Sequence, residues 1–137
     1  MSIQEYTSSD YDKVIKLWIS CGLIKSDKQA TRQQLSSFLE RGIFLVRKDK
    51  AGTISGTVMG GWDGWRGWIY KLAVAEEERR EGIGTQLLNE IASRLHNSGA
   101  TIVRAYIENE NEASLALFDK LGYEKMDGFV IVTKGRQ

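Results

Sequence analysis

Several residue types that mark whole classes of protein are scarce in this sequence of 137 residues, which has no proline, one cysteine and one histidine. The single cysteine, Cys21, excludes a disulfide within the chain. With His96 as the one histidine, too few ligands are present for a zinc site of the Cys/His type. The missing proline gives no indication of function. We therefore expect no bound metal and a reducing, cytoplasmic environment.

Long apolar runs are missing as well. None approaches the roughly 18 residues that a membrane-spanning helix needs, and the first ten residues lack the basic and apolar segments of a signal peptide. Neither sign of charge dominates, because 19 Lys and Arg stand against 18 Asp and Glu, for a net charge of +1. That balance predicts no general attraction to nucleic acid or to an anionic membrane, although it allows a local basic site for a small anion.

What is present fits one globular domain over residues 1–137, with 42% hydrophobic and 27% charged residues. Apolar spacing predicts an α/β protein with about four helices and six to seven strands. The expected strands are 3–6, 43–49, 53–62, 67–75, 101–107, 123–126 and 129–134, and the expected helices are 8–22, 31–42, 83–97 and 111–122. The succession of strand 67–75, a helix and strand 101–107 predicts a right-handed crossover between parallel strands.

The segment ERREGIGTQ, residues 78–86, follows the most apolar strand and leads into the third helix. A helix N-terminus presents unpaired N–H groups and a partial positive charge. Gly82 and Gly84 would let a phosphate approach this backbone closely, and Arg79 and Arg80 add cationic donors. The chemistry is that of a diphosphate site. A tight strand-to-helix turn surrounded by solvated charges is the alternative.

Two common phosphate loops do not fit this segment. The dinucleotide-binding fingerprint needs a third glycine where this chain has Leu87, and it belongs after the first strand of its fold. The P-loop needs a lysine between its last glycine and the Ser or Thr, whereas Thr85 follows Gly84 directly. A nucleotide-binding domain of either kind is therefore disfavoured.

A third pattern does fit. Arg79, Gly82 and Gly84 after a central strand, followed by Asn111 and the segment LFDKLGY at 117–123, resemble the GCN5-related N-acetyltransferases (GNAT family). The resemblance covers almost the whole chain. It implies the GNAT fold, a mixed and mostly antiparallel sheet whose fourth and fifth strands splay apart. It also implies that acetyl-CoA binds in the gap between those strands.

The resemblance further implies which residues bind the cofactor. The pantetheine arm should pair with the backbone of strand 67–75, and the pyrophosphate should bind the loop after it. An N–H near Leu72 or Ala73 should polarise the thioester carbonyl, as in an oxyanion hole. The cofactor-binding residues expected on this basis are Leu72, Ala73, Val74, Arg79, Arg80, Glu81, Gly82, Ile83, Gly84, Thr85, Asn111 and Phe118.

The catalytic positions depart from the family's pattern. Phe118 stands where the family usually has a tyrosine acid, and a phenyl ring donates no proton. Tyr106 stands where a glutamate base is frequent. Tyr106 could instead protonate the leaving thiolate, and Glu108 could accept a proton through water. Half-buried packing for Tyr106 and a solvated loop position for Glu108 are the alternatives.

Aromatic residues surround an acid in GGWDGWRGWIY, residues 60–70. We expect Trp62, Asp63 and Trp65 to bind the acceptor, because an aromatic wall with a carboxylate attracts a cationic amine. The alternative is that these rings pack the sheet and cap its turn. The glycine-rich pattern 56–67 also resembles small bacterial GNAT members of the YpeA-like group, which are related to ribosomal-protein alanine acetyltransferases.

Two functions remain open at this stage. The first is direct transfer of an acetyl group, within a ternary complex, from acetyl-CoA to a primary amine of a small molecule or a protein N-terminus. The second is a CoA-binding sensor or interaction module with little catalysis, which Phe118 favours. A homodimer is also open, because many relatives pair through their sheet edges.

Overall fold

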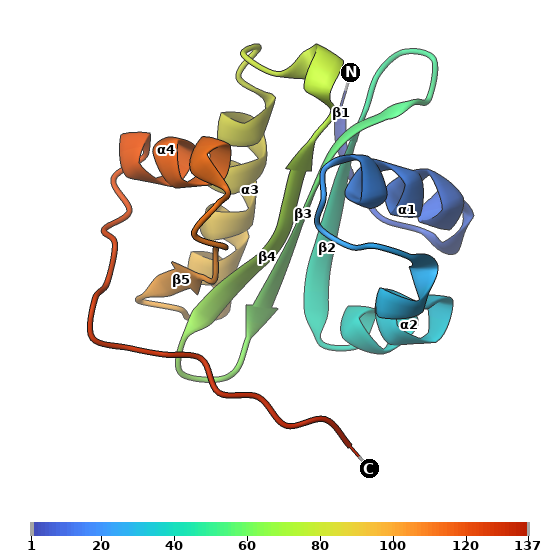
Figure 1. Ribbon diagram of the computed structural model, residues 1–137. Helices are drawn as coiled ribbons and strands as arrows, with labels where there is room; N and C mark the ends of the chain where they lie inside the picture. The colour runs from blue at the N-terminus through green and yellow to red at the C-terminus, as the bar shows by residue number, and fades with distance from the viewer. Residues whose placement is uncertain (1, 137) are drawn as a thin grey trace. The chain divides into compact units, whose positions relative to one another are not determined.

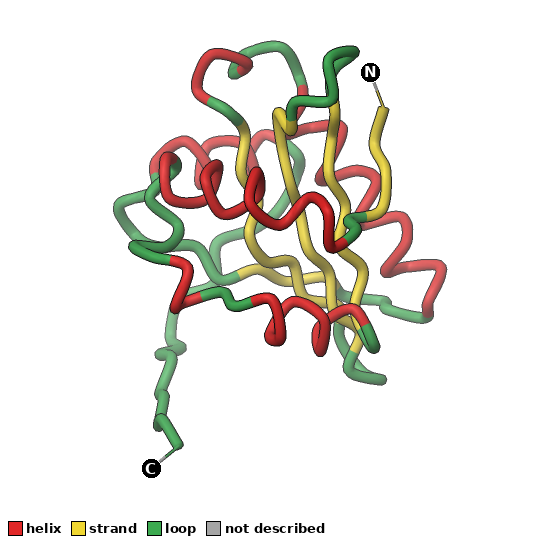
Figure 2. Tube along the Cα trace, turned by 90° about the vertical axis from the view of Figure 1, so that its right-hand side faces the viewer, coloured by secondary structure: helices red, strands yellow, loops and turns green. Residues whose placement is uncertain are grey.

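A computed structural model describes residues 2–136, which divide into two compact units. The first unit ends at Tyr106 and contains one five-stranded sheet in the order β1-β2-β3-β4-β5. The strands are β1 (Ser2–Glu5), β2 (Gly42–Lys48), β3 (Ile54–Trp62), β4 (Gly67–Val74) and β5 (Val103–Ala105). The first four pair antiparallel, and β5 runs parallel to β4 (Figures 1 and 2). This mixed, mostly antiparallel sheet confirms the predicted fold class and the crossover.

Three helices cover this sheet and a fourth lies in the second unit, which begins at Ile107. Helices α1 (Tyr11–Ser20) and α2 (Arg32–Leu39) lie on one face, and α3 (Ile83–Ser98) lies on the other (Figure 1). Helix α4 is Glu112–Lys120, and short 3-10 turns occupy Ser8–Asp10, Asp27–Gln29 and Glu76–Glu78. None of the helices in residues 2–136 combines the length and apolar character needed to cross a membrane.

The sheet is shorter than the sequence predicts at its C-terminal end. Residues 123–126 and 129–134 are not strands, and β5 has three residues rather than the seven expected. The side chains of Phe129, Val130 and Val132 are exposed. A strand needs a hydrogen-bonded partner, and within the described residues these segments have none. The prediction of six to seven strands was therefore wrong by one or two.

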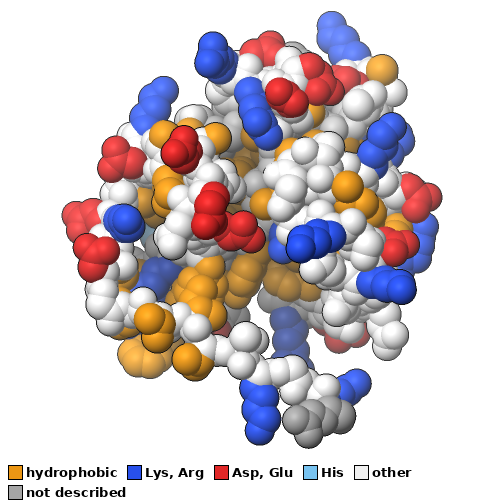
Figure 3. Space-filling view, viewed as in Figure 1, with side chains coloured by type: hydrophobic (Ala, Val, Ile, Leu, Met, Phe, Trp, Pro, Cys, Tyr) orange, Lys and Arg blue, Asp and Glu red, His pale blue; other side chains and the backbone are white. Residues whose placement is uncertain are grey.

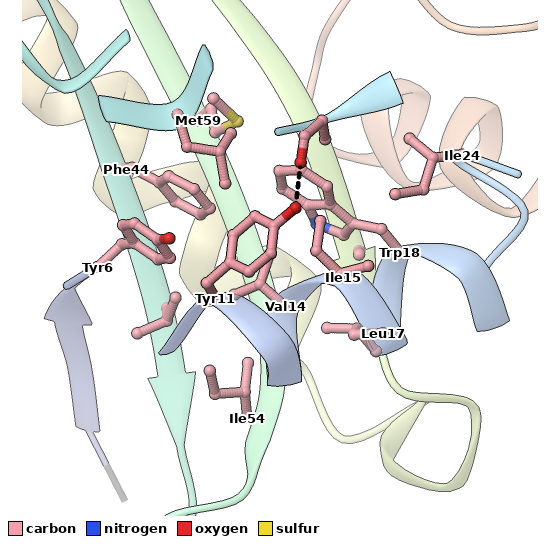
Figure 4. Close-up of a cluster of buried hydrophobic side chains, with 14 of the residues drawn as sticks. Tyr6, Tyr11, Val14, Ile15, Leu17, Trp18, Ile24, Phe44, Ile54 and Met59 are labelled. Carbon is pink, nitrogen blue, oxygen red and sulfur yellow. Dashed lines mark hydrogen bonds between the residues drawn. The ribbon is translucent and has the colours of Figure 1, made fainter. Parts of the chain in front are cut away.

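Stacked aromatic rings join α1 to the sheet (Figure 4). Phe44 on β2 lies between Tyr6 and Trp18, with ring centroids 4.3 Å and 5.7 Å away and nearly parallel planes. The hydroxyl of Tyr11 donates to the carbonyl of Ala30 over 2.8 Å, so this buried polar group is satisfied. The cluster fixes Trp18 against the middle of the sheet.

Two glycines on β3 let α3 approach the opposite face. A Cβ at Gly56 would lie 2.7 Å from a methyl of Leu87, and one at Gly60 would lie 2.7 Å from Ile91. Leu87 and Ile91 are both completely buried. Because a side chain at either glycine would displace α3, these positions fix the distance of that helix from the sheet.

A buried ion pair links the start of α1 to β2. Lys48 Nζ lies 2.9 Å from Asp10 Oδ1, and the backbone N–H of Thr7 donates to Asp10 Oδ2 over 3.0 Å. Burial, the largest single influence, raises the pKa of Asp10, but the hydrogen bonds from Lys48 and Thr7 and the lysine charge outweigh it and lower this pKa overall. Asp10 is therefore ionised and paired at neutral pH.

We expect Lys48→Met to lower the free energy of unfolding by about 2 kcal/mol at pH 7, because it leaves a buried carboxylate unpaired. The pKa of Asp10 is lowered in the folded protein, so this stabilisation is complete above the unfolded pKa of about 3.9. It is lost as the pH falls through the folded-state pKa. Urea unfolding of both proteins across the acidic range measures this, and a difference that stays constant down to the lowest pH would contradict it.

Charges are mixed on the protein surface. On the face seen in Figure 3, acidic and basic side chains alternate without a large field of one sign. On that face, the surface charges are thus as balanced as the sequence composition.

Candidate functional site

The edge of β4 that faces β5 is paired over less than half of its length. Residues 67–69 pair with 103–105 of β5, whereas residues 70–74 have no strand beside them on that edge in the described chain. The two strands therefore separate, as the splay predicted for the fourth and fifth strands requires. Unpaired backbone groups along 70–74 are available to an extended ligand.

A β-bulge lies in this unpaired half of β4. Thr57 of β3 pairs with Ala73, and Met59 pairs with Tyr70, so two residues of β4 lie opposite one of β3. The first of the two, Lys71, has a φ of 52°, which is unusual for a side chain of this size. Bulges leave backbone groups outside the ladder and occur often beside functional sites.

A buried hydrogen-bond chain supports the bulge from the α1 side. Trp18 Nε1 donates to Thr57 Oγ1 over 2.8 Å, and Thr57 Oγ1 donates to the carbonyl of Lys71 over 3.0 Å. Trp18 and Thr57 are completely buried, so the bond between them forms away from water, whereas the bond to Lys71 is partly buried. The carbonyl of the strained residue is therefore fixed by a side chain of the neighbouring strand.

Helix α3 begins with backbone N–H groups that have no partner. Gly82 is its N-cap residue, with a φ of 80° and no capping side chain. Within the described chain, the N–H groups of Ile83, Gly84 and Thr85 make no hydrogen bond. Arg80 also has a positive φ, 73°, and alternation of left- and right-handed residues makes successive N–H groups converge. The segment, which we call the anion site because such N–H groups can bind an anion, therefore presents unpaired donors at the positive end of a helix dipole.

The charged residues around this anion site are partly engaged with the protein itself. Arg79 Nε donates to the carbonyl of Val74 over 3.1 Å, which ties the loop to the end of β4. Its Nη2 lies 3.8 Å from Cys21 Sγ. A hydrogen bond to Glu81 raises the pKa of the Glu78 carboxyl. Both Arg79 and Arg80 were predicted to bind phosphate. The side chain of Arg79 is bonded to the protein itself, whereas that of Arg80 makes no bond within the described residues.

A pocket of about 260 Å³ lies on the other face of the sheet, between α2 and the ends of β2, β3 and β4. Gly42 and Gly61 are paired across β2 and β3, so no side chain fills its floor. The ring of Phe38 would come within 2.4 Å of a Cβ at Gly42, and the ring of Tyr70 would lie 3.4 Å from one at Gly61. The residues that line this acceptor pocket, as we call it, are Ser37, Phe38, Arg41, Gly42, Gly61, Trp62, Asp63, Trp68 and Tyr70.

Asp63 organises the turn beside the acceptor pocket. Its Oδ1 accepts the backbone N–H groups of Arg66, over 2.7 Å, and Trp65, over 2.8 Å, and its Oδ2 accepts Trp68 Nε1 over 3.1 Å. These hydrogen bonds, in that order, lower the pKa of the Asp63 carboxyl. Asp63 is therefore ionised, with much of its hydrogen-bonding capacity used within the turn.

The two tryptophans predicted to bind the acceptor lie in different places. Trp62 borders the pocket, but its indole ring packs near Gly99 at the end of α3, 3.2 Å from where a Cβ would be. Trp65 lies outside the lining, is 72% exposed and stacks under the guanidinium of Arg66 at 4.5 Å. Of the three residues predicted to bind the acceptor, Trp62 and Asp63 thus border the pocket and Trp65 does not.

Two tyrosine hydroxyls are available on the pocket side of the sheet. Tyr106 is 60% exposed, and its ring lies 5.1 Å from that of Trp68. Tyr70 meets Phe38 edge to face, with centroids 6.1 Å apart. Burial, with smaller effects of Tyr106 and Asp63, raises the pKa of Tyr70. Tyr70 is therefore a protonated hydroxyl at neutral pH, directly before the bulge.

Phe38, Arg41 and Tyr70 line the pocket but are not among the residues that the sequence predicts to bind the acceptor. Tyr70 could have been found, because strand alternation puts it on the same face as Trp68. Phe38 and Arg41 could not, since nothing in the helix pattern of α2 specifies which strand ends it covers. Their position depends on tertiary packing alone.

Three further predicted site residues, Glu108, Asn111 and Phe118, belong to the second unit. Asn111 is the N-cap of α4, and its Oδ1 accepts the N–H of Ser114 over 3.1 Å. Phe118 packs edge to face on Tyr123, with centroids 4.8 Å apart. Glu108 is exposed, and its carbonyl accepts the N–H of Asn111. Their roles in cofactor binding and catalysis stay predictions.

Comparison with known proteins identifies the architecture. A model of the acetyltransferase (GNAT) family matches residues 11–123, which is well over half of the chain and includes β4, the anion site and α4. A GNAT-family acetyltransferase from Staphylococcus aureus Mu50 is similar in structure. Its TM-score is 0.81 at 17% identity, over 92% of this chain and 85% of that one.

Two aminoglycoside acetyltransferases are also similar in structure. The aminoglycoside antibiotic 6'-N-acetyltransferase AAC(6')-IG from Acinetobacter haemolyticus has a TM-score of 0.81 at 15% identity, over all of both chains. AAC(6')-Iy, in complex with the bisubstrate analog CoA-S-monomethyl-acetylneamine, has a TM-score of 0.77 at 14% identity, over 98% of both. At these identities the likeness establishes the GNAT fold and not a shared substrate.

Proposed function

We propose, because this chain belongs to the GNAT acetyltransferase family, that it transfers an acetyl group from acetyl-CoA to a primary amine by direct attack within a ternary complex. One observation supports this most. The unpaired N–H groups of residues 83–85 follow, after the loop 75–82, a strand whose edge is free over residues 70–74. A diphosphate joined to an extended, amide-containing arm is complementary to that combination.

The residues of this chain fit the parts of acetyl-CoA in order along the sequence. The free edge of β4 offers N–H and C=O groups to the two amides of the pantetheine arm. The N-terminus of α3, with Gly82 and Gly84, offers the pyrophosphate N–H donors without a Cβ in the way. Arg80 can add a charge-assisted bond. Asn111 and Phe118 are further proposed contacts.

The transfer step needs a neutral amine, since an ammonium group, with a pKa of about 10.4 when free, has no lone pair. The amine nitrogen attacks the thioester carbonyl carbon, the C–S bond breaks, one amine proton is lost and the thiolate is protonated. An N–H at the bulge, near Leu72 or Ala73, stabilises the oxyanion. We assign the thiolate's proton donor to Tyr106 and the water-mediated base to Glu108.

The tyrosine assignment predicts that Tyr106→Phe lowers kcat about tenfold without changing CoA affinity, because a thiolate leaves tolerably without help. Tyr70→Phe is the matched control, since it removes the other hydroxyl on the same face of the sheet. Steady-state thiol release and CoA titration measure both effects. A loss of kcat in Tyr70→Phe alone would transfer the role to Tyr70 and contradict the assignment.

The proposal includes two classes of acceptor. The two similar aminoglycoside acetyltransferases make a small-molecule amine the first class to consider, and the resemblance to the YpeA-like group makes a protein N-terminus the second. Thiol release from acetyl-CoA across polyamines, aminoglycosides, amino acids and peptides tests the proposal. Release above background with any of them is the expected result.

A CoA-binding module without catalysis is the second candidate, favoured by Phe118 at the usual acid position. Tight CoA binding with no release from any amine would support it and contradict the transferase. A protein that binds neither CoA nor acetyl-CoA would contradict both.

A further inference from the structure

The charge and shape of the acceptor pocket indicate a class of acceptor. We propose that the pocket binds a small primary amine that also carries a carboxylate and an aromatic or apolar body, as an aromatic amino acid does, with Arg41 as the ligand of the carboxylate. This inference rests on the proposed acetyl transfer, because it names the substrate class of the same site.

Arg41 is the one basic residue among the described residues that line the pocket, and its side chain is exposed to solvent. Its backbone N–H donates to the carbonyl of Phe38 over 3.0 Å, which fixes its position just beyond α2. No side-chain hydrogen bond, ion pair or ring contact involves Arg41 within the part of the chain that the structure describes. A guanidinium binds a carboxylate through two parallel hydrogen bonds, so a free arginine in a pocket favours an anionic group in the ligand.

The acid in the lining is poorly suited to a polycation. The two carboxylate oxygens of Asp63 already accept three hydrogen bonds, two from its own turn and one from Trp68 on β4. Arg66, whose charge further lowers the pKa of Asp63, lies next to the same turn. No second acid lines the pocket. An aminoglycoside, with several ammonium groups, would thus meet Arg41 and one occupied carboxylate in the lining.

The aromatic walls of the acceptor pocket are arranged to hold one ring of a ligand. Phe38 and Tyr70 are nearly perpendicular, at 86°, and Trp68 lies on the same strand face as Tyr70. The glycine floor leaves room beneath them, but the volume of about 260 Å³ is below the roughly 300–1,000 Å³ typical of pockets for drug-sized ligands. An acceptor of amino-acid size fits this space.

The two ends of the pocket orient such an acceptor. Arg41 follows α2 at one side, and Tyr70 borders the other and directly precedes the bulge of β4. With the carboxylate on Arg41 and the ring between Phe38 and Trp68, the amine is directed toward the free edge of β4. That edge is where the proposed thioester would lie.

The test uses L-phenylalanine, its decarboxylated analogue 2-phenylethylamine, and kanamycin, each with saturating acetyl-CoA. We expect kcat/KM for L-phenylalanine to exceed that for 2-phenylethylamine at least about tenfold, the value of one charge-assisted bond. Arg41→Gln should abolish the preference by raising KM for L-phenylalanine alone, and Arg41→Lys should restore part of it. Arg66→Gln removes the same positive charge from a residue outside the lining, and it should leave the preference unchanged.

Calorimetry separates failure of this inference from failure of the proposed function. If CoA binds but 2-phenylethylamine or kanamycin is used as well as L-phenylalanine, the inference is wrong and the transferase stands. If CoA does not bind, the transferase is wrong, and titration of L-phenylalanine into wild type and Arg41→Gln still tests the pocket. Equal binding by both proteins, or none, would overturn the assignment of Arg41.

Discussion

Gly82→Asp is expected to weaken CoA binding about 30- to 100-fold relative to Gly82→Asn, while leaving the protein at least as stable as that variant. The aspartate carboxylate would occupy the converging N–H groups at the start of α3. It would also place a negative charge within a few ångströms of the pyrophosphate, where like charges repel by up to about 4 kcal/mol. Calorimetric titration of CoA measures the affinity, and thermal unfolding measures the stability.

The asparagine variant is a close control because both side chains have the same shape. Position 82 has a φ of 80°, which Asn and Asp tolerate better than other side chains, and a Cβ there meets no atom within 4 Å. Both residues are good N-caps, and the negative charge of aspartate further stabilises a helix N-terminus. Affinity and stability should therefore change in opposite directions. Equal CoA affinity of the two variants would mean that the phosphates bind elsewhere.

Thr57→Val is expected to lower the free energy of unfolding by about 3 kcal/mol, because one completely buried and one partly buried polar group lose their shared partner. These are Trp18 Nε1, 2.8 Å from the threonine hydroxyl, and the carbonyl of Lys71, 3.0 Å from it. Valine has nearly the same shape, so packing is not the cause. Because Lys71 is the strained residue of the bulge, kcat should also fall. Urea unfolding and thiol release measure the two effects.

Thr57→Ser is the control for this prediction. It retains the hydroxyl and removes one methyl group, which costs about 1 kcal/mol. If valine leaves the stability unchanged while serine lowers it, the hydroxyl contributes nothing and the threonine serves packing alone. If valine destabilises but kcat is unchanged, the bulge is not part of the catalytic arrangement.

Local sequence patterns predicted the parts of the fold that depend on local preferences. The apolar stripe of α3 and the apolar runs of β2, β3 and β4 predicted a helix and three strands, and the structure confirms these elements. The segment 129–134 has the same β-preference but is not a strand. Alternation states which residues favour an extended chain, whereas only a neighbouring strand provides the hydrogen bonds.

In the candidate site, too, some features could be predicted from local sequence and others depend on tertiary packing. Glycines at a strand-to-helix boundary indicate an anion site in the sequence, and the structure has unpaired N–H groups there. The bulge at Lys71 has no such signature, because a lysine with a φ of 52° is held by Thr57 and not by its own preference. The free guanidinium of Arg41 likewise depends on where α2 packs. Strain and pocket shape are tertiary properties and were not predictable from the chain alone.

A crystal structure of this protein with acetyl-CoA tests the proposed cofactor site most directly. The predicted result has pyrophosphate oxygens within hydrogen-bonding distance of the N–H groups of Ile83 and Gly84, and the pantetheine arm paired along residues 70–74 of β4. A diphosphate bound away from the start of α3, or a free edge of β4 with no pantetheine beside it, would contradict the proposal.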